Sequence, residues 1–233
     1  MLRSTVKRFG YSHGLLYLCN RILERIFGPR VFIQHYQFVA LATETPIPLP
    51  RRLASNMTTT VLSSSEIASL AVPRPKEKLR SRLSDGSTCL VTRKNGTFAG
   101  FIWIKRGVYL EDEVRSRYDI SSDWRSVWDY DMYIAPSFRN TAAFLKIWHD
   151  TLDFLRKEDV RWSISRISAF APESLRAHLR LGGKIIGGAY YFRLFAVQLT
   201  LFSQRPFVHL SLSDRSPPSI MLRTPISQEP PRR

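Results

Sequence analysis

Residues 128–183 read WDYDMYIAPSFRNTAAFLKIWHDTLDFLRKEDVRWSISRISAFAPESLRAHLRLGG and form the most regular pattern in the chain. Residues 128–134 are rich in aromatic side chains and alternate acidic with apolar positions, and Pro136 stops them because proline cannot donate to a β-ladder. They predict a strand with two different faces. From Ala143 to Leu155 apolar residues recur at helical spacing, which predicts an amphipathic helix.

The second half of this segment continues the alternation of strands and helices. Residues 162–169 alternate as a strand, Pro172 favours the first turn of a short helix, and Gly182-Gly183 ends it. Strand, helix and strand in this order predict a parallel crossover. The first helix, capped by Asn140 or Thr141, would then begin beside a strand end, where an anionic cofactor binds favourably.

The preceding residues predict the rest of a sheet. Residues 57–62 favour a strand and 76–83 a charged helix, and 88–93 and 98–105 favour a hairpin joined through Asn95-Gly96. Apolar residues on both faces of 98–105 are typical of a central strand covered on both sides. The predicted fold class is α/β (α+β), a mixed central β-sheet with helices on both faces.

The two ends of the chain differ from this middle part. Residues 15–27 predict an amphipathic helix whose apolar face either packs on the main domain or lies on a membrane surface, since basic residues flank it. Both alternatives stay open. A strand and a proline-rich linker follow. We expect an N-terminal helix-and-strand extension, a main domain, and a Ser/Pro/Arg-rich tail that is poorly ordered from Ser216, at residues 1–52, 53–202 and 203–233.

Composition limits the classes of function. With 233 residues and 44% hydrophobic content the chain can bury one core. No apolar run is long enough to span a bilayer and no convincing signal-peptide cleavage site follows the basic N-terminus, so a cytoplasmic location is expected. The net charge of +16 is spread along the chain without a nucleic-acid-binding motif, so no specific nucleic acid is expected. Cys19 and Cys89 have no metal-ligand spacing, so no metal is expected.

The motifs in residues 128–183 resemble those of the GNAT superfamily of acyl-CoA-dependent N-acyltransferases. That family follows its cofactor strand with a phosphate-binding turn, Arg/Gln-x-x-Gly-x-Gly/Ala, which corresponds here to Arg139–Phe144. A later motif, Asn-x-x-Ala-x-x-x-Tyr-x-x-x-Gly-Phe, corresponds to Ala171–Gly183. The resemblance covers about residues 56–200 and implies a GNAT-like domain. The departures from the family pattern are Ala142, Phe144, Ala171, His178 and Gly183.

The resemblance implies that acetyl-CoA or another acyl-CoA is the co-substrate and that an amine, not identified by the sequence, is the acceptor. Because Ala142 and Phe144 replace glycines, we expect a narrower phosphate turn. The residues implied in cofactor binding are Met132, Tyr133, Ile134, Arg139, Asn140, Thr141, Ala142, Ala143, Phe144 and Ser174.

Three residues are candidates for proton transfer. Asp129 and Asp131 are two apart on one predicted strand and so are expected to share a face, where one could accept the amine proton. The alternative is that both are solvated or paired with arginines. His178 stands where the family often has a tyrosine acid and could protonate the leaving thiolate; the alternative is a surface or hydrogen-bonded structural histidine.

Two weaker sets of polar residues complete the candidates. The acidic loop Glu111–Glu113 either holds a cationic acceptor amine or is a hydrated loop, and Ser165, Arg166 and Ser168 are candidates to line the cofactor cleft. The predicted function is an N-acyltransferase that moves an acetyl or longer acyl group from CoA to an amine of a small molecule or peptide. The alternative is a non-catalytic GNAT-like module that recruits an anionic partner.

Overall fold

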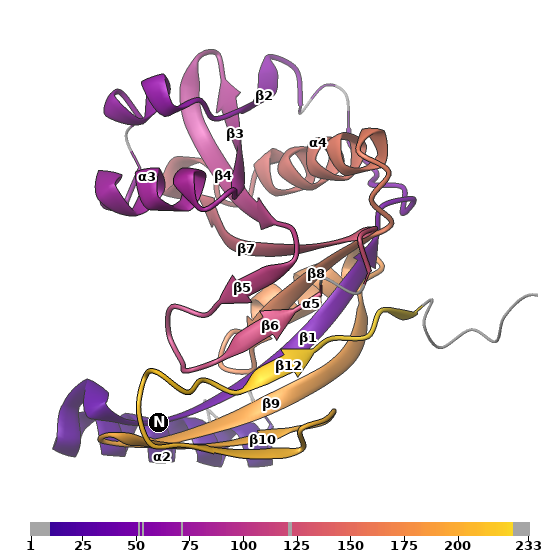
Figure 1. Ribbon diagram of the computed structural model, residues 1–233. Coiled ribbons are helices and arrows are strands. Elements are labelled where there is room, and N and C mark those ends of the chain that lie inside the picture. The colour runs from indigo at the N-terminus through magenta and orange to yellow at the C-terminus, as the bar shows by residue number, and fades with distance from the viewer. Residues whose placement is uncertain (1–9, 51, 53, 71, 121–122, 226–233) are drawn as a thin grey trace, which may run out of the picture. The chain divides into compact units, whose positions relative to one another are not determined.

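The computed structural model describes residues 10–50, 52, 54–70, 72–120 and 123–225 (Figure 1). The chain forms two compact units, each assembled from separate segments. Unit 1 comprises Met1–Leu41, Val108–Ser122 and Ile164–Arg233, and unit 2 comprises Ala42–Gly107 and Asp123–Ser163. The fold is mixed α/β, as predicted, with β-sheet and helices in both units.

Unit 2 is built on an antiparallel sheet with the strand order β7-β4-β3-β2. The hairpin turn between β3 and β4 has positive φ at both Asn95 (49°) and Gly96 (79°), which is the primed turn that this dipeptide favours. The predicted strands of this unit are therefore confirmed. Their bounds are β2 (Met57–Val61), β3 (Thr88–Lys94), β4 (Thr97–Lys105) and β7 (Ser126–Ile134).

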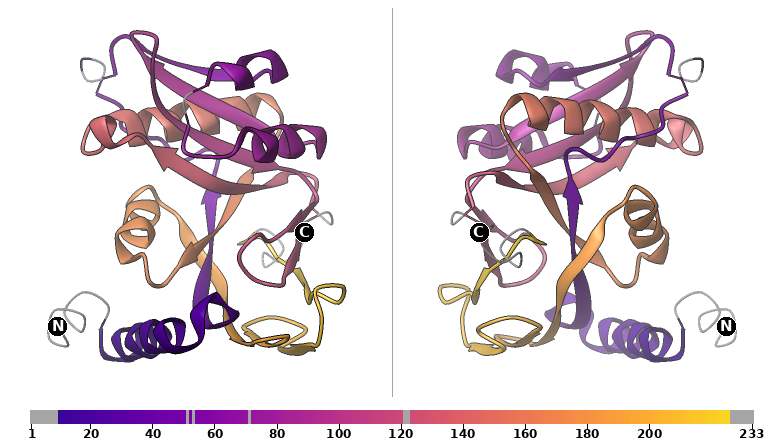
Figure 2. Two further views of the ribbon diagram at one scale, coloured as in Figure 1. Left: turned by 90° about the vertical axis from the view of Figure 1, so that its left-hand side faces the viewer. Right: turned by 90° about the vertical axis from the view of Figure 1, so that its right-hand side faces the viewer.

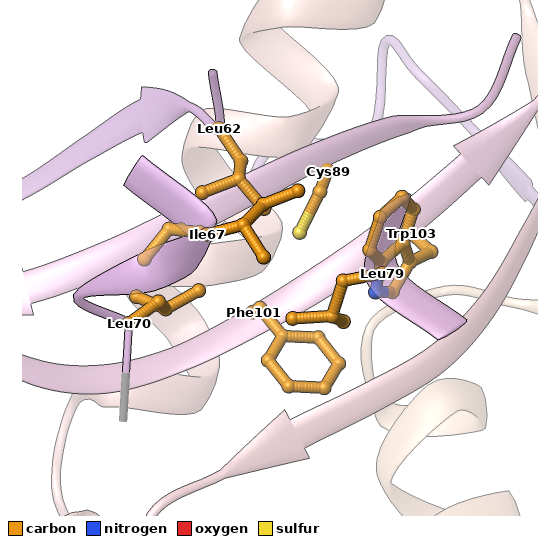
Figure 3. Packing of buried hydrophobic residues seen from close by; sticks show 8 residues of the cluster. Leu62, Ile67, Leu70, Leu79, Cys89, Phe101 and Trp103 are labelled. Atoms are coloured by element: carbon orange, nitrogen blue, oxygen red, sulfur yellow. The ribbon is translucent and has the colours of Figure 1, made fainter. Parts of the chain in front are cut away.

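Helices cover both faces of this sheet. On one face, η2 (Ser64–Ala68) and α3 (Lys76–Ser84) bring Ile67 and Leu79 onto Phe101 and Trp103 in a buried cluster (Figure 3). On the other face, α4 (Ala143–Lys157) follows η3 (Pro136–Phe138) and buries Ala143 against Met57 and Ala99. The predicted amphipathic helix is confirmed.

Unit 1 contains strands in the order β11-β10-β9-β1-β8, and the pairs β1–β9, β9–β10 and β10–β11 are antiparallel. The short helix α5 (Pro172–Arg180) begins at proline and is followed by Gly182, as predicted. The first two residues of β8 belong to unit 2. The strand bounds are β1 (Val31–Ala42), β8 (Trp162–Ser168), β9 (Lys184–Leu194), β10 (Val197–Phe202) and β11 (Val208–Ser211).

A small three-stranded sheet of unit 1 corrects the expected disorder of the tail. It has the order β12-β6-β5, with β12 (Ser219–Met221) parallel to β6 (Arg117–Asp119) and β5 (Val108–Leu110) antiparallel to it. Ile220 and Leu222 are buried, so this part of the tail is held by packing as well as by strand pairing. The prediction of poor order from Ser216 is wrong as far as Pro225; its remainder, 226–233, lies outside the described residues.

The N-terminal helix α2 (Tyr11–Phe27) ends at η1 (Gly28–Arg30), as its Gly-Pro predicts, but packs through an unexpected face. His13 Nε2 lies 3.0 Å from His35 Nδ1 on β1, and Asn20 Oδ1 accepts a 2.6 Å hydrogen bond from Ile33 N. The apolar face does not pack inward, because Leu15, Ile22 and Ile26 are exposed. Among the described residues, none of the helices combines the length and apolar character needed to cross a bilayer.

Candidate functional site

A bulge interrupts β7 in the middle of the predicted cofactor strand. Tyr130 lies opposite Trp103 and Tyr133 opposite Phe101, so three steps along β7 match two steps along β4. Asp131 and Met132 together face the single residue Ile102, and Asp131 has φ of 46°. The sequence does not indicate this bulge, because its aromatic and acidic residues alternate as they would in a regular strand.

The bulge separates the two aspartates that were expected to share a face. Asp129 lies opposite Ile104, whereas the Asp131 carboxylate bonds Arg74 and Arg82, which lie over the rings of Tyr133 and Trp103 on the α3 face. Trp103 and Ile104 are neighbours on one strand and point to opposite faces. The prediction of a paired-carboxylate arrangement is therefore wrong.

Asp131 is held between two guanidinium groups. Arg74 Nε donates to Asp131 Oδ2 at 2.9 Å, and Arg82 Nη1 donates to the same oxygen at 2.5 Å. The hydrogen bond to Asp131 is the main cause that raises the pKa of Arg74 above its ordinary value. The carboxylate and Arg82 are 12% and 11% exposed, so this pair is largely removed from water. The arginine-paired alternative applies to Asp131.

Asp129 occupies a different environment. It is buried, and its Oδ2 accepts a 2.6 Å hydrogen bond from Ser163 Oγ at the start of β8. Both residues belong to unit 2. The Ser163 hydroxyl can pass a proton to this carboxylate, whereas Asp131 is held by two guanidinium groups, so Asp129 is the better base candidate of the two aspartates.

The turn between β7 and α4 reaches its curvature without glycine. Asn140 takes the left-handed conformation with φ of 62°, which asparagine tolerates, whereas Ala142 has φ of −69°. The side chains of Ala142 and Ala143 are buried in unit 2, so these methyl groups do not occupy the outer side of the turn. The expected narrowing by Ala142 therefore does not arise at this position. Phe144 is half-buried and has contacts of its own.

The start of α4 provides an anion-binding environment. Thr141 Oγ1 accepts from Ala143 N at 3.2 Å and donates to Phe138 O, so it caps the helix from one residue before the N-cap, Ala142. The helix dipole and the first amides of a 15-residue helix favour negative charge at this end. Arg139 is exposed in the same turn and has no acidic partner within the described parts of the chain.

The remaining predicted residues of β7 have mixed surroundings. Met132, Tyr133 and Ile134 are half-buried; Tyr133 stacks on Phe101, and Ile134 packs beside Ala143. A Cβ added to Gly100 would lie only 2.4 Å from Tyr133 O and 2.8 Å from Ile147 Cδ1, so glycine is required where β4 passes the bulged strand.

Ser174 and His178 lie on α5 in unit 1. His178 is buried, and its Nδ1 donates to Ser174 O at 2.7 Å, because a carbonyl oxygen can only accept. This contact fits the structural alternative for the histidine. It also leaves Nε2 as the ring atom that would carry an exchangeable proton.

The acidic loop of unit 1 has one buried carboxylate, that of Glu111, while Asp112 and Glu113 are exposed, as in a hydrated loop. Both carboxylate oxygens of Glu111 accept 2.7 Å hydrogen bonds from Arg166, and the Glu111 side chain is fully buried. Glu113 accepts from Tyr36 OH at 2.7 Å and pairs with Arg166 at 3.1 Å. Burial alone would lower the pKa of Arg166, but Glu111, Tyr36 and Glu113 raise it above its ordinary value. Arg166 therefore serves an internal ion network.

Sequence reasoning missed Arg74, Arg82 and Ser163, the partners of the two aspartates. Arg74 lies in a loop and Arg82 on α3, 57 and 49 positions from Asp131, so no local pattern joins them. Ser163 stood beside the strand residues that were considered, and its strand was correctly predicted. No cluster of three or more His, Cys, Asp or Glu residues suited to a metal occurs in the described part of the chain.

Comparisons with known proteins come from structures alone: no protein-family model and no curated protein matches the sequence. A conserved protein of unknown function from Staphylococcus epidermidis has a TM-score of 0.48 at 14% identity, over 74% of this chain and 66% of that one. A protein assigned to the GNAT acetyltransferase family from Novosphingobium aromaticivorans has a TM-score of 0.43 at 13% identity, over 70% and 65%. A Salmonella typhimurium protein described as an acetyltransferase, solved with acetyl-CoA, has a TM-score of 0.40 at 16% identity, over 55% and 79%. The chain spans just under two thirds of the first two structures.

Proposed function

We propose that this protein is an acyl-CoA-dependent N-acyltransferase that transfers an acetyl or longer acyl group to an amine of a small molecule or peptide. The observation that carries this proposal is the succession, within unit 2, of a bulged strand, a turn with an exposed arginine, Arg139, and a helix N-terminus. This succession matches the motif order on which the family resemblance rests.

Each part of the succession suits one part of CoA. The diphosphate is doubly anionic and would bind at Arg139 and the positive end of the α4 dipole. The pantetheine arm is an extended chain with two amides, and it can bond backbone groups that a bulge removes from the ladder, here at Asp131 and Met132. Asn140 and Thr141 would hold the turn, while Ala142 and Ala143 would support it from the core.

The reaction requires a neutral amine to attack the thioester carbonyl. The new C–N bond forms as the C–S bond breaks, the amine loses a proton, and the thiolate gains one. We assign Asp129, through Ser163, as the proton acceptor. His178, on α5 of unit 1, stays the proton donor that the family resemblance implies. Asp131 becomes a positioning residue that holds Arg74 and Arg82 beside the bulge.

A non-catalytic module is the second candidate. All three expected catalytic side chains contact other residues of the protein: Asp131 pairs with Arg74 and Arg82, Asp129 accepts from Ser163, and His178 donates to Ser174 O. A protein that retains the anion site but lacks the chemistry would bind a CoA-like or other anionic partner without turnover.

Thermal unfolding with CoA ligands tests the binding step. At a concentration a hundred times its dissociation constant a ligand adds about 2.7 kcal/mol, which is a rise of about 5–10 °C for a protein of this size. Arg139→Ala should abolish most of this rise. The matched control is Arg80→Ala, an exposed arginine on α3 that should leave the rise unchanged. No rise with acetyl-CoA, longer acyl-CoA or free CoA contradicts both candidates as CoA binders.

Release of free CoA across a panel of amines separates the two candidates. With an active amine, Asp129→Asn should lower kcat by about a hundredfold or more, the range for a lost acid or base, while the rise in melting temperature persists. Binding of acyl-CoA without release with any amine favours the non-catalytic module.

A further inference from the structure

The outer face of α2 is an exposed apolar stripe. Residues at intervals of three or four share one face of a helix, and this face carries Leu15, Ile22 and Ile26, which are 64%, 58% and 65% exposed. The opposite face makes the contacts with unit 1, through His13 and Asn20. The apolar face of α2 therefore points away from the protein, whereas a helix that completes a core turns its apolar face inward.

One face of the unit 1 sheet is also exposed and apolar. His35, Tyr190, Leu201 and Val208 are opposite one another on successive strands from β1 to β11, so their side chains lie on one face. α2 covers this face at β1, where His13 stacks on His35. Beyond β1 the face stays open, and its exposed large apolar residues are Tyr190, Leu194, Val197, Leu199, Leu201, Val208 and Leu210.

The end of α2 contacts the turn between β9 and β10. Phe27 at the end of α2 contacts Phe195 in the β9–β10 turn, with ring centroids 6.3 Å apart. Figures 1 and 2 place α2 and the β10 region side by side at the same end of unit 1. We call the exposed apolar residues of α2 and of β9–β11 the apolar surface of unit 1. A surface built from this many large apolar side chains marks an interaction site.

The charges on the same elements indicate what covers this surface. Exposed or half-exposed basic residues outnumber acidic ones on α2, η1 and the β9–β11 segment, so an anionic partner is favoured. A second copy of the chain would bring two basic surfaces together, which is unfavourable. The basic residues are Arg21, Arg25, Arg30, Lys184 and Arg205, against Glu24.

We propose that the apolar surface of unit 1 docks on the surface of a bilayer that contains anionic lipids. The apolar side chains of α2 and of the sheet face enter the boundary between headgroups and acyl chains, and the arginines and lysine around them contact lipid phosphates. This attachment is peripheral, and it does not depend on the acyl transfer proposed for unit 2.

Flotation of the full chain with lipid vesicles tests the proposal. Vesicles of equal parts phosphatidylcholine and phosphatidylglycerol should bind the protein at least about tenfold more strongly than phosphatidylcholine alone, and added salt should weaken the binding. Equal binding to both vesicles, or binding to neither, overturns the proposal.

Two pairs of variants locate the contact. Ile22→Ser with Ile26→Ser should lower vesicle binding by about tenfold or more, whereas the matched exposed pair Val61→Ser with Trp124→Ser on unit 2 should not. Arg21→Glu with Arg25→Glu should lower it by a similar factor, and Arg80→Glu with Lys157→Glu should not. All these side chains are exposed, so circular dichroism should show intact folds.

The oligomeric state distinguishes a protein partner from a lipid one. Light scattering should give a monomer in solution for the parent chain and for the Ile22/Ile26 variant. A dimer that this variant dissociates, together with unchanged vesicle binding by the variant, would assign the apolar surface to a second copy and overturn the proposal.

Discussion

Two pairs of acidic residues in this chain have the same spacing in sequence but different surroundings in the structure. Glu111 and Glu113 in unit 1 converge on one arginine, Arg166, whereas Asp129 and Asp131 in unit 2 are turned to opposite faces of a bulged strand. Glu111 and Glu113 share one cation. Asp129 and Asp131 have separate partners: a serine hydroxyl for Asp129 and two guanidinium groups for Asp131.

This difference shows that sequence spacing predicts which carboxylates are neighbours only where the strand is regular. In unit 1 the loop around residues 111–113 brings both carboxylates onto one cation, with Glu111 buried and Glu113 exposed. In unit 2 one extra residue reverses the side of every side chain beyond it. A buried carboxylate held by two guanidinium groups is stabilised as the anion, whereas a hydroxyl such as that of Ser163 can pass a proton to the carboxylate that it contacts.

The largest expected effect is at the unit 1 network. Arg166→Met leaves the fully buried Glu111 carboxylate without its cation, and should lower the free energy of unfolding by about 3–5 kcal/mol in urea titration. The double variant Arg166→Met with Glu111→Met should recover most of that loss, since neither buried charge remains. A single variant as stable as the parent chain would show that the network contributes little.

A smaller loss is expected where the bulged strand passes β4. Gly100→Ala places a methyl group against Tyr133 O and Ile147 Cδ1, and should cost about 1–3 kcal/mol, measured by thermal unfolding. If the variant instead keeps its stability, the close approach of β4 and β7 that accompanies the bulge is not maintained in solution.

The expected loss of stability at the Asp131 cluster is smaller than the losses at the Arg166 network and at Gly100. Asp131→Asn leaves Arg74 and Arg82 without a counter-charge and should cost about 1–2 kcal/mol, while kcat with any active amine falls less than for Asp129→Asn. Glu77→Gln, which breaks the exposed 3.8 Å pair with Arg80, should cost less than about 0.5 kcal/mol. Loss of turnover in Asp131→Asn equal to that of Asp129→Asn would return Asp131 to a catalytic role.

The smallest effect concerns acid stability. Burial alone would raise the pKa of Glu113, but Arg166 and the hydrogen bond from Tyr36 lower it below its ordinary value. Its contribution is therefore complete above the usual carboxyl pKa and is lost as pH falls through the lowered value. Tyr36→Phe removes a donor, so urea titrations from neutral to acidic pH should show a weaker dependence on pH than in the parent chain. An unchanged dependence would contradict the assigned cause.

Periodicity and turn chemistry in the sequence determined most secondary structure. The Asn95-Gly96 hairpin, the stripe of α4 and the proline at the start of α5 are local signals, and each gave the correct element. The residues of the turn before α4 were likewise placed correctly between strand and helix. Local signals suffice here because backbone hydrogen bonds and side-chain alternation act over a few residues.

Tertiary structure decided what those elements do. The bulge in β7, the partners Arg74, Arg82 and Ser163, and the outward apolar stripe of α2 depend on contacts between residues far apart in sequence. The amphipathic pattern of α2 indicates that one side of the helix is apolar. Only the packing on β1 through His13 and Asn20 determines which side contacts the rest of the protein. Ion pairs and faces are properties of the assembled chain, because the free energy of a charge or an apolar group depends on what surrounds it rather than on its neighbours in sequence.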